Sequence, residues 1–450
     1  MRYYLDPFGC VKNQVDAETM MAFLNGAHWA AAEDPAEADL IIINSCGFIE
    51  SAKQESINAV LAYRKTYPDT KIVLAGCLAQ RYAQELSKAL PEADLLFGNQ
   101  DLSKILEAVS IILEDSPVKE GSGNILIPKT AAYSFSGKRP LLSLPGSAYI
   151  KISEGCNNRC TFCAIPRIRG PLVSRPVPQA LEECRELLDR GIRELCLIGQ
   201  DIGSYWTDRI AGSGESRLPE LLEALSKLEG RFWVRLLYIH PDHFPLPILD
   251  IIRRDSRFVP YFDLPFQHGS HRILKAMNRR GTAESYLALI DRIRTMLPDA
   301  VLRSTFLTGF PGETEEDFQA LLDFQNKARL DWVGCFTYSR EEDTPAYSMK
   351  PRIPKILAAK RKRIIEEQQV PITEKQMNRF IGRILDVLVE EQAAGENGLY
   401  LGRLFCHAPE VDGSAVIRSA VPLEPGTLIR GNVCARAGFD LEVAAIDSSV

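Results

Sequence analysis

The feature that most constrains this chain is a group of three closely spaced cysteines within residues 155–170. Cys156, Cys160 and Cys163 form a CxxxCxxC pattern directly after a strand-like run, Ser147 to Ser153. Cysteine thiolates are the usual protein ligands of iron–sulfur clusters. Three thiolates on a four-iron cluster leave one iron without a protein ligand, and that iron can chelate a small molecule.

A zinc site and a chance group of buried thiols are the alternatives. A structural zinc site needs four ligands, and no other Cys or His lies near the three in the sequence. Cys184 falls in a helical pattern and Cys196 inside an apolar strand, so neither is placed to complete a zinc site. Cysteine is often buried, but three cysteines among polar, arginine-rich residues do not resemble a core. The pattern therefore favours a cluster with one open iron.

This spacing resembles the signature of the radical S-adenosylmethionine (SAM) enzymes. The resemblance implies that the open iron binds the amino and carboxylate groups of SAM. It also implies that one electron from the cluster cleaves SAM to methionine and a 5′-deoxyadenosyl radical.

Bulk properties narrow the class of protein further. The chain has 450 residues, enough for about three domains. It has no apolar run of membrane-spanning length and no signal-peptide pattern, which favours a cytoplasmic protein. Eleven cysteines in such a chain indicate metal ligands or reactive thiols rather than a disulfide framework. The net charge of −6 gives no overall signature of nucleic-acid binding.

Residues 1–117 alternate between short apolar runs and stretches of helical periodicity. This alternation predicts an open parallel α/β domain. The expected strands are Arg2–Leu5, Leu40–Asn44 and Lys71–Ala75, and the expected helices are Asp16–Asn25, Ser51–Tyr63 and Leu78–Leu90.

Each expected strand of this domain is followed at once by a cysteine in a glycine-containing turn. These cysteines are Cys10, Cys46 and Cys77. The turns after parallel strands gather along one edge of a sheet, where ligands bind. A buried structural cysteine is the commoner case for each alone, but three equivalent placements favour a second cluster with one open iron.

A linker is expected over 118–140, with a short strand at Asn124–Pro128. Residues 141–375 then predict six strand–helix units, among them strands at Tyr261–Pro265 and Val301–Thr308 and a helix at Ala283–Met296. These units resemble the partial (β/α)₆ barrel of radical SAM enzymes. Catalytic groups of such barrels lie at the C-terminal ends of the strands. Residues 376–450 change to short alternating strands, which predict a small β-barrel.

The chain as a whole resembles the methylthiotransferases, which join a three-cysteine domain, a radical SAM barrel and a C-terminal TRAM barrel. The motifs that carry the resemblance are Gly9–Asn13, Asn44–Phe48, Gly76–Leu78, His240–His243, Phe266–Ser270, Gly309–Thr314 and Ala408–Gly413. Val11 departs from the Pro or Ser that relatives often carry. His268 and the His240–His243 stretch favour the branch that modifies ribosomal proteins over the branch that modifies adenosine in tRNA.

Charge points to the same branch. Residues 380–450 hold five arginines, no lysine and ten acidic residues. A barrel that grips tRNA should be basic, because phosphate contacts dominate RNA affinity. An acidic barrel suits a basic protein partner.

The resemblance implies an activity and its cofactors. A methylthio group would replace a hydrogen on the β-carbon of an aspartate in a small-subunit ribosomal protein of the uS12 type. Two [4Fe–4S] clusters would be needed, with SAM as methyl donor and radical source. Cys156, Cys160 and Cys163 would hold one cluster, and the other three cysteines the second. A reductant of flavodoxin or ferredoxin type and a sulfur donor would be partners.

The other site residues are less sharply defined, and no catalytic acid or base is identified. Gln200, Arg235, Gln267 and Glu313 are candidates for the SAM pocket, with polar pairing in the barrel core as the alternative. The arginines near the first motif could offset cluster charge or steer the SAM carboxylate, although solvation explains most such residues: Arg159, Arg167, Arg169 and Arg175. Structural roles are expected for four histidines, with metal binding as the alternative: His240, His243, His268 and His271. A tRNA-modifying enzyme and a non-catalytic iron–sulfur scaffold are the alternative functions.

Overall fold

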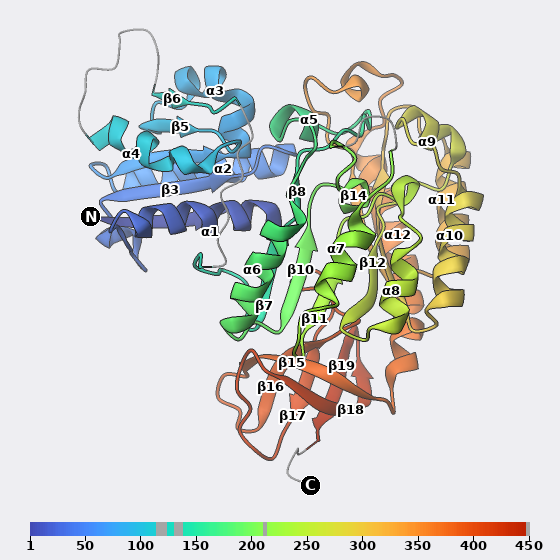
Figure 1. The fold of residues 1–450 in the computed structure, drawn as a ribbon. Coiled ribbons are helices and arrows are strands. Elements are labelled where there is room, and N and C mark those ends of the chain that lie inside the picture. The colour runs from blue at the N-terminus through green and yellow to red at the C-terminus, as the bar shows by residue number, and fades with distance from the viewer. Residues whose placement is uncertain (114–123, 130–137, 210–213, 447–450) are drawn as a thin grey trace. The chain divides into compact units, whose positions relative to one another are not determined.

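The computed structural model describes residues 1–113, 124–129, 138–209 and 214–446 (Figure 1). The chain divides into two compact units. The first, here the cysteine unit, comprises Met1–Leu142, Ser153–Arg175 and Ser339–Tyr347. The second, here the barrel unit, comprises Ser143–Ile152, Pro176–Tyr338 and Ser348–Val450. Among the described residues no helix has both the length and the apolar character needed to cross a membrane.

The domain boundaries expected from sequence stay a prediction. Most of the expected linker, 118–140, lies outside the described residues. Within its described part, the short strand expected at Asn124–Pro128 is present as β6, Ile125–Leu126.

The cysteine unit is built on a six-stranded sheet in the order β2-β1-β3-β4-β5-β6, with all neighbours parallel. The strands are β1 (Arg2–Pro7), β2 (Ala30–Ala31), β3 (Leu40–Ser45), β4 (Lys71–Gly76), β5 (Leu95–Phe97) and β6. The helices are α1 (Val11–Gly26), α2 (Glu50–Thr66), α3 (Cys77–Ala89) and α4 (Ile105–Leu113). The open parallel α/β domain expected from sequence is confirmed.

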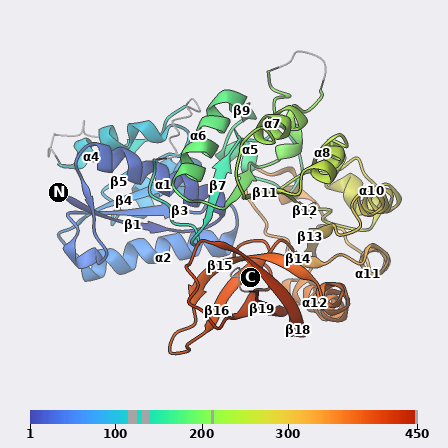
Figure 2. The same ribbon diagram turned by 60° about the horizontal axis from the view of Figure 1, so that its bottom comes forward.

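Apolar side chains on both faces of β3 and β4 explain why helices cover the sheet on both sides. Leu40 and Ile42 face the core shared with α1 and α4, whereas Ile41 and Ile43 face the core shared with α2 and α3. Figure 2 shows α1 and α2 on opposite sides of the strands. The result is a three-layer domain whose strands all end at one edge.

The segment 153–175, which carries the CxxxCxxC motif, belongs to the same unit. Its ends pair as two short antiparallel strands, β8 (Ser153–Glu154) and β9 (Val173–Ser174). Between them lies one short helix, α5 (Ile165–Ile168).

The barrel unit contains a second parallel sheet, in the order β14-β13-β12-β11-β10-β7. From β7 to β14 the strands follow chain order across the sheet, as expected for repeated strand–helix units. They are β7 (Ser147–Lys151), β10 (Glu194–Ile198), β11 (Trp233–Leu236), β12 (Phe258–Asp263), β13 (Val301–Thr308) and β14 (Trp332–Thr337).

Helices follow these strands and bury their apolar stripes against the sheet. They are α6 (Val177–Asp189), α7 (Leu218–Leu225), α8 (Ile248–Arg254), α9 (His271–Ala276), α10 (Ala283–Met296), α11 (Glu315–Ala328) and α12 (Lys355–Met377). Two helices begin with capping boxes, at Thr282 and Thr314, which satisfy amide groups left without partners in the first turn. The six expected strand–helix units are confirmed.

The C-terminal residues close into a five-stranded barrel, β15-β16-β17-β19-β18. Its strands are β15 (Ile384–Gln392), β16 (Leu399–Leu404), β17 (Ala415–Arg418), β18 (Leu428–Ala437) and β19 (Asp440–Ala445), seen from below in Figure 2. Closure leaves the sheet without an edge. The expected small β-barrel is confirmed.

Candidate functional site

Three strand-end turns of the cysteine unit bring Cys10, Cys46 and Cys77 together. Cys10 precedes α1 just after β1, Cys46 follows β3, and Cys77 begins α3 directly after β4. These strands are neighbours in the sheet. The turns approach closely: a Cβ atom on Gly9 would lie 2.9 Å from Cys46 Cβ, and one on Gly47 would lie 2.7 Å from the Cys77 carbonyl oxygen. The sequence expectation that these turns meet therefore agrees with the geometry.

The three thiols also interact electrostatically. Burial, together with the neighbouring Cys77 and Cys10, raises the pKa of Cys46 to about 12. Burial raises the pKa of Cys77 as well, and Arg169 opposes that rise. Three soft sulfur ligands at one edge match the donor set of an iron–sulfur cluster. Cluster binding would require their deprotonation and would release protons.

The side chain of Asn13 holds the turns after β1, β3 and β4 together. Its side chain is fully buried. Its Nδ2 donates to the carbonyl oxygens of Phe8 at 3.0 Å and Ser45 at 2.9 Å. Its Oδ1 accepts from Cys77 Sγ at 3.2 Å. One amide therefore links the turns after β1, β3 and β4.

The CxxxCxxC motif lies in the loop closed by β8 and β9. The amide of Cys156 donates to the Gly170 carbonyl at 3.1 Å, and the amide of Cys163 donates to the Cys160 carbonyl at 3.1 Å. All three cysteines are partly exposed rather than buried in the core. This exposure fits ligands presented by a loop better than it fits structural thiols.

Neither group of cysteines forms a disulfide: all eleven cysteines lie in the described residues and none is oxidised to one. Within the same described residues, no three His, Cys, Asp or Glu side chains are close enough to hold a single metal ion. Ligands of a four-iron cluster bind different irons, so they need not converge on one point. The assignment of six cysteines to two clusters stays a prediction.

Three candidates for the SAM pocket follow strands of the barrel unit: Gln200 after β10, Gln267 after β12 and Glu313 after β13. Gln267 has a φ of +70°, and its backbone bonds to Thr305 and Leu307 of β13. The Glu313 carboxylate accepts from the Gly309 amide at 2.7 Å and forms an ion pair with Arg361 at 2.6 Å. Glu313 therefore shapes the loop after β13, and the SAM role of these residues stays a prediction.

Arg235 lies within β11, and its contacts do not favour a role in binding SAM. Its Nε forms an ion pair with Glu194 at 2.7 Å, and its Nη1 donates to the Phe405 carbonyl of the C-terminal barrel at 2.9 Å. The side chain is fully buried. These contacts favour the alternative of polar pairing in the core, and a SAM contact by Arg235 stays a prediction that they do not support.

The histidines of the family motifs have structural partners. His243 Nδ1 lies 3.0 Å from Asp201 Oδ2, and this hydrogen bond raises the pKa of His243. The buried His268 accepts at Nδ1 from the Ser270 amide at 2.9 Å. Asp201 and His243 lie after β10 and β11, so this imidazole–carboxylate pair lies at the carboxyl edge of the sheet.

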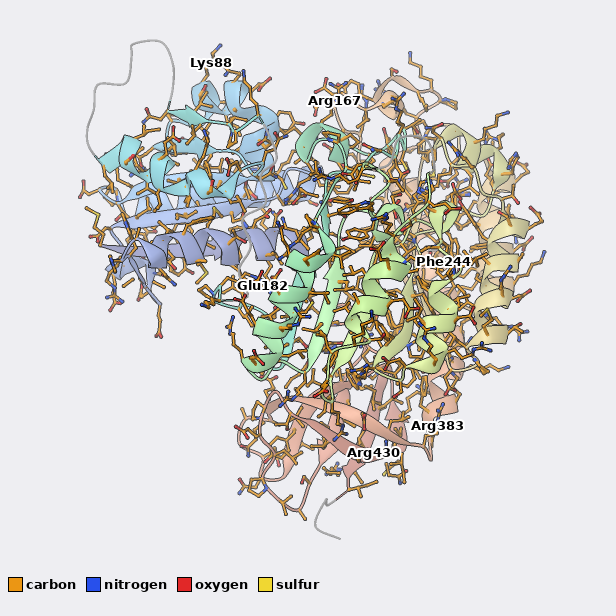
Figure 3. All side chains as sticks on the ribbon, viewed as in Figure 1. Lys88, Arg167, Glu182, Phe244, Arg383 and Arg430 are labelled. Atoms are coloured by element: carbon orange, nitrogen blue, oxygen red, sulfur yellow. The ribbon has the colours of Figure 1, made fainter. Side chains whose placement is uncertain are left out.

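The arginines of the CxxxCxxC loop separate into two classes. Arg159 and Arg167 are exposed, as expected for solvated residues, and Arg167 is labelled in Figure 3. Arg169 and Arg175 are each 2% exposed. Arg169 contacts Cys77 of the other group, with 3.2 Å between Nη2 and Sγ. Sequence reasoning allowed Arg169 to offset cluster charge but did not identify Cys77 as its partner, because its sequence neighbours do not reveal a contact 92 positions away.

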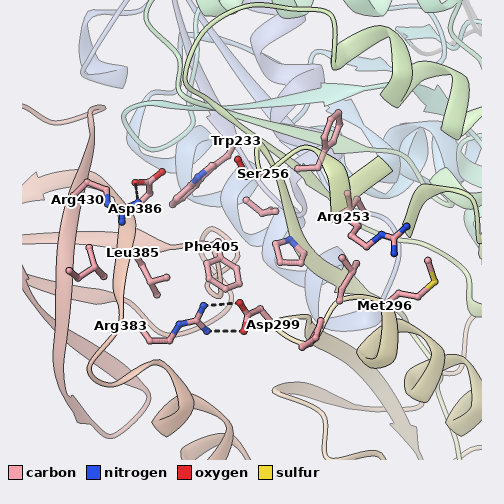
Figure 4. A pocket seen from close by; sticks show the side chains of 17 residues that line it. Trp233, Arg253, Ser256, Met296, Asp299, Arg383, Leu385, Asp386, Phe405 and Arg430 are labelled. Carbon is pink, nitrogen blue, oxygen red and sulfur yellow. Dashed lines mark hydrogen bonds and ion pairs between the residues drawn. The ribbon is translucent and has the colours of Figure 1, made fainter. Parts of the chain in front are cut away.

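A cavity of about 410 Å³ lies elsewhere in the barrel unit, between the start of β12 and the C-terminal barrel (Figure 4). Arg383 of the barrel pairs with Asp299 across it at 2.7 Å. Trp233, Phe258 and Phe405 contribute apolar walls. It contains none of the predicted site residues and lies at the amino ends of β11 and β12.

Comparisons with known proteins match three parts of the chain to known families. Residues 2–98 match the Uncharacterized protein family UPF0004, residues 150–324 match the Radical SAM superfamily, and residues 381–446 match the TRAM domain. Among solved structures, the radical S-adenosylmethionine methyltransferase TsrM from Kitasatospora setae superposes with a TM-score of 0.57 at 15% identity, covering 77% of this chain and 74% of that one. This likeness concerns the fold alone. Together the fold and the matches define a radical SAM enzyme.

Curated relatives identify the family. A protein named ribosomal protein uS12 methylthiotransferase RimO from Treponema denticola is 47% identical over 98% of this chain and 100% of the relative. A protein of the same name from Acetivibrio thermocellus is 40% identical, covering 98% of this chain and 97% of the relative. The chain belongs to the family of ribosomal protein uS12 methylthiotransferases, and SAM and an iron–sulfur cluster are the cofactors that radical SAM membership implies.

Proposed function

We propose that this chain attaches a methylthio group to the β-carbon of an aspartate in ribosomal protein uS12, using two [4Fe–4S] clusters and SAM. The names of full-length relatives support the reaction and its substrate. The observation that carries the two-cluster mechanism is the meeting of the turns of Cys10, Cys46 and Cys77 at one edge of a parallel sheet. A ribosomal substrate also favours a cytoplasmic location.

In this proposal the two groups of cysteines have separate tasks. Cys156, Cys160 and Cys163 hold the cluster that binds SAM, and the other three hold the cluster that presents sulfur. When bound, these groups supply the one-electron chemistry that breaks an unactivated C–H bond, and the sulfur that replaces the hydrogen. The reductant, of flavodoxin or ferredoxin type, and the sulfur donor are separate partners.

The chain's own residues keep the surroundings of this chemistry fixed. Glu313 holds the amides of the loop after β13. Asp201 holds the His243 ring by its Nδ1 atom, which fixes the orientation of the imidazole. Such positioning matters because misalignment of reacting groups costs large factors in rate.

The C-terminal barrel supports a protein substrate over tRNA. Its carboxylates at Glu391, Glu396, Glu410 and Glu424 are exposed. An exposed acidic surface attracts a basic ribosomal protein and repels RNA phosphates.

The test supplies the reconstituted enzyme with SAM, a strong reductant, a sulfide source and equal amounts of uS12 and tRNA. Mass spectrometry should find the mass gain of one methylthio group on a uS12 peptide that contains the modified aspartate. A gain on tRNA adenosine instead would show that tRNA, and not uS12, is the substrate. No SAM cleavage at all would leave a non-catalytic scaffold.

Two variants separate the roles of the two groups. Cys156→Ala should abolish production of 5′-deoxyadenosine, because the SAM-binding cluster loses a ligand. Cys46→Ala should keep that production and lose methylthiolated product. Deoxyadenosine from the first variant, or methylthiolated product from the second, would contradict the assignment.

A further inference from the structure

The most unusual polar group outside the predicted ligands is the guanidinium of Arg169. It lies directly after α5, on the segment that carries the CxxxCxxC motif, and is 2% exposed. Its Nη1 forms an ion pair with Asp16 at 2.6 Å and lies 3.4 Å from Glu154. Its Nη2 donates to Asn13 Oδ1 and, at 3.2 Å, to Cys77 Sγ. All of these residues belong to the cysteine unit.

The way Arg169 is held suggests that its contact with sulfur is built in. Asn13 and Asp16 are three positions apart on α1, so their side chains share one face of the helix. Asp16 fixes one nitrogen of the planar guanidinium, and the second nitrogen is thereby turned toward Cys77. A lysine could carry the charge but could not hold both partners with one rigid fork.

Packing reinforces this contact. Ile168 and Ala164 form a small buried cluster with Cys77, against which Phe48 packs. The segment after the first cysteine motif is therefore fitted onto the third cysteine of the second group. A solvated arginine, which the sequence favoured, would have none of these contacts.

We propose that Arg169 is a positioning residue that tunes the cluster held by Cys10, Cys46 and Cys77, by donating a hydrogen bond to Cys77 Sγ. This inference rests on the proposed function, because it requires the second cluster. Hydrogen bonds to ligand sulfurs and nearby positive charge favour the more negative, reduced state of an iron–sulfur cluster and raise its reduction potential. Arg169 therefore makes the second cluster easier to reduce.

The test uses the full chain with Cys156, Cys160 and Cys163 all replaced by Ala, so that the second cluster is the only one present. Arg169→Gln, Arg169→Lys and Asp16→Asn are added singly to this parent. Iron content reports loading, and a potentiometric titration followed by electron paramagnetic resonance reports the midpoint potential. Arg139→Gln is the matched control, since Arg139 is 1% exposed and pairs with Glu18 at 2.8 Å.

Arg169→Gln should lower the equilibrium constant for cluster reduction about tenfold, which is about 59 mV toward negative potential for one electron. Arg169→Lys should recover part of the shift because it keeps the charge. Asp16→Asn should also lower the potential, by less. Loss of the Asp16 negative charge alone would raise the potential, so a fall in this variant reports that Arg169 has lost its orientation toward Cys77, and it decides the matter if Arg169→Gln loads too little iron. Arg139→Gln should leave the potential unchanged.

The outcomes distinguish this inference from the proposed function. A parent variant that binds no iron would refute the second cluster, and the inference with it. A parent that binds about four irons, with the same midpoint potential in the Arg169 and Asp16 variants, would overturn the inference alone. Equal shifts in Arg139→Gln would also overturn it, because any buried arginine would then have the effect.

Discussion

Gly9 limits how closely the turns of Cys10 and Cys46 can approach. Its φ is +93°, and an added Cβ would lie 2.9 Å from Cys46 Cβ and 3.4 Å from its Sγ. A side chain at this position is strained by its backbone conformation and also pushes one ligand away. Gly9→Ala should therefore prevent loading of the second cluster and reduce the iron content from about eight to about four atoms per chain.

Gly26 provides the control for this change. It ends α1, the helix that Cys10 precedes, and an added Cβ there meets nothing within 4 Å. Gly26→Ala should bind as much iron as the unchanged protein. Full iron content in Gly9→Ala would show that the turn does not position a ligand.

Individual residues differ in how far sequence could assign them. Six cysteines stood out because their spacing and their positions after strands are visible in one dimension. The ion pair between Arg169 and Asp16 did not, since it spans 153 positions and leaves no periodic pattern. Arg235 looked like a site residue because it occurs in a barrel strand, but its guanidinium pairs with Glu194 and reaches the C-terminal barrel.

At the scale of elements, the start of β10 joins the parallel sheet to the C-terminal barrel. Glu194 is fully buried between Arg235 of β11 and Arg403 of β16, at 2.7 and 2.6 Å. Burial alone would raise the pKa of Glu194, but Arg403 and Arg235 outweigh it and lower the pKa to about 2. Stability from this carboxylate is present above its unfolded pKa and is lost as pH falls toward 2. The loss amounts to about 3 kcal/mol.

Glu194→Gln tests the contribution of these ion pairs to the stability of the apoprotein. The variant removes the anion that pairs with the buried Arg235 and one of the two carboxylates that pair with Arg403, so its thermal midpoint at pH 7 should be several degrees lower. The difference from the unchanged protein should shrink as the pH falls from about 4.5 to about 2.5. Glu223→Gln removes an exposed partner of Arg254 and should have little effect. A constant difference in thermal midpoint across this pH range would show that stability does not depend on the protonation of Glu194.

The bounds of helices and strands were predicted more accurately where the periodic pattern in the sequence was longer. The bounds of β13 and α10 agree with the expected Val301–Thr308 and Ala283–Met296, because both runs are long and periodic. The three-residue strand β5 was not expected, since a run that short carries no period. β12 starts at Phe258 rather than Tyr261, and Pro260 explains the difference: it lies where the pairing with β11 is irregular, as a residue without an amide hydrogen requires.

At the scale of the whole molecule, chain order did not reveal how segments are grouped. The CxxxCxxC segment follows a strand of the barrel unit, yet Ser153–Arg175 clusters with the cysteine unit, as does Ser339–Tyr347. Glu341 shows how such a segment is fixed, since it pairs with Lys53 at 3.1 Å and Arg81 at 2.7 Å. Ion pairs between residues so far apart in sequence leave no local pattern to predict them from.

The acidic surface of the C-terminal barrel leads to a prediction about the binding of uS12. Replacing Glu391, Glu396 and Glu424 by Lys changes exposed positions of the C-terminal barrel. If this surface attracts a basic protein, binding of uS12 should weaken by roughly tenfold at low salt, mainly through slower association. SAM cleavage without substrate should not change, because none of the three is near a predicted ligand in sequence. Surface plasmon resonance over a range of salt concentrations measures the effect.

A matched set of charge reversals separates a local effect from an overall one. Glu33, Glu55 and Glu85 are exposed on the cysteine unit, so replacing them by Lys changes net charge by the same amount. Long-range steering by net charge alone would weaken uS12 binding equally in both sets, which would contradict a docking role for the barrel. Weakening confined to the barrel set, and lost as salt screens the charges, is the expected result, since the barrel carboxylates would then contact the ribosomal protein directly.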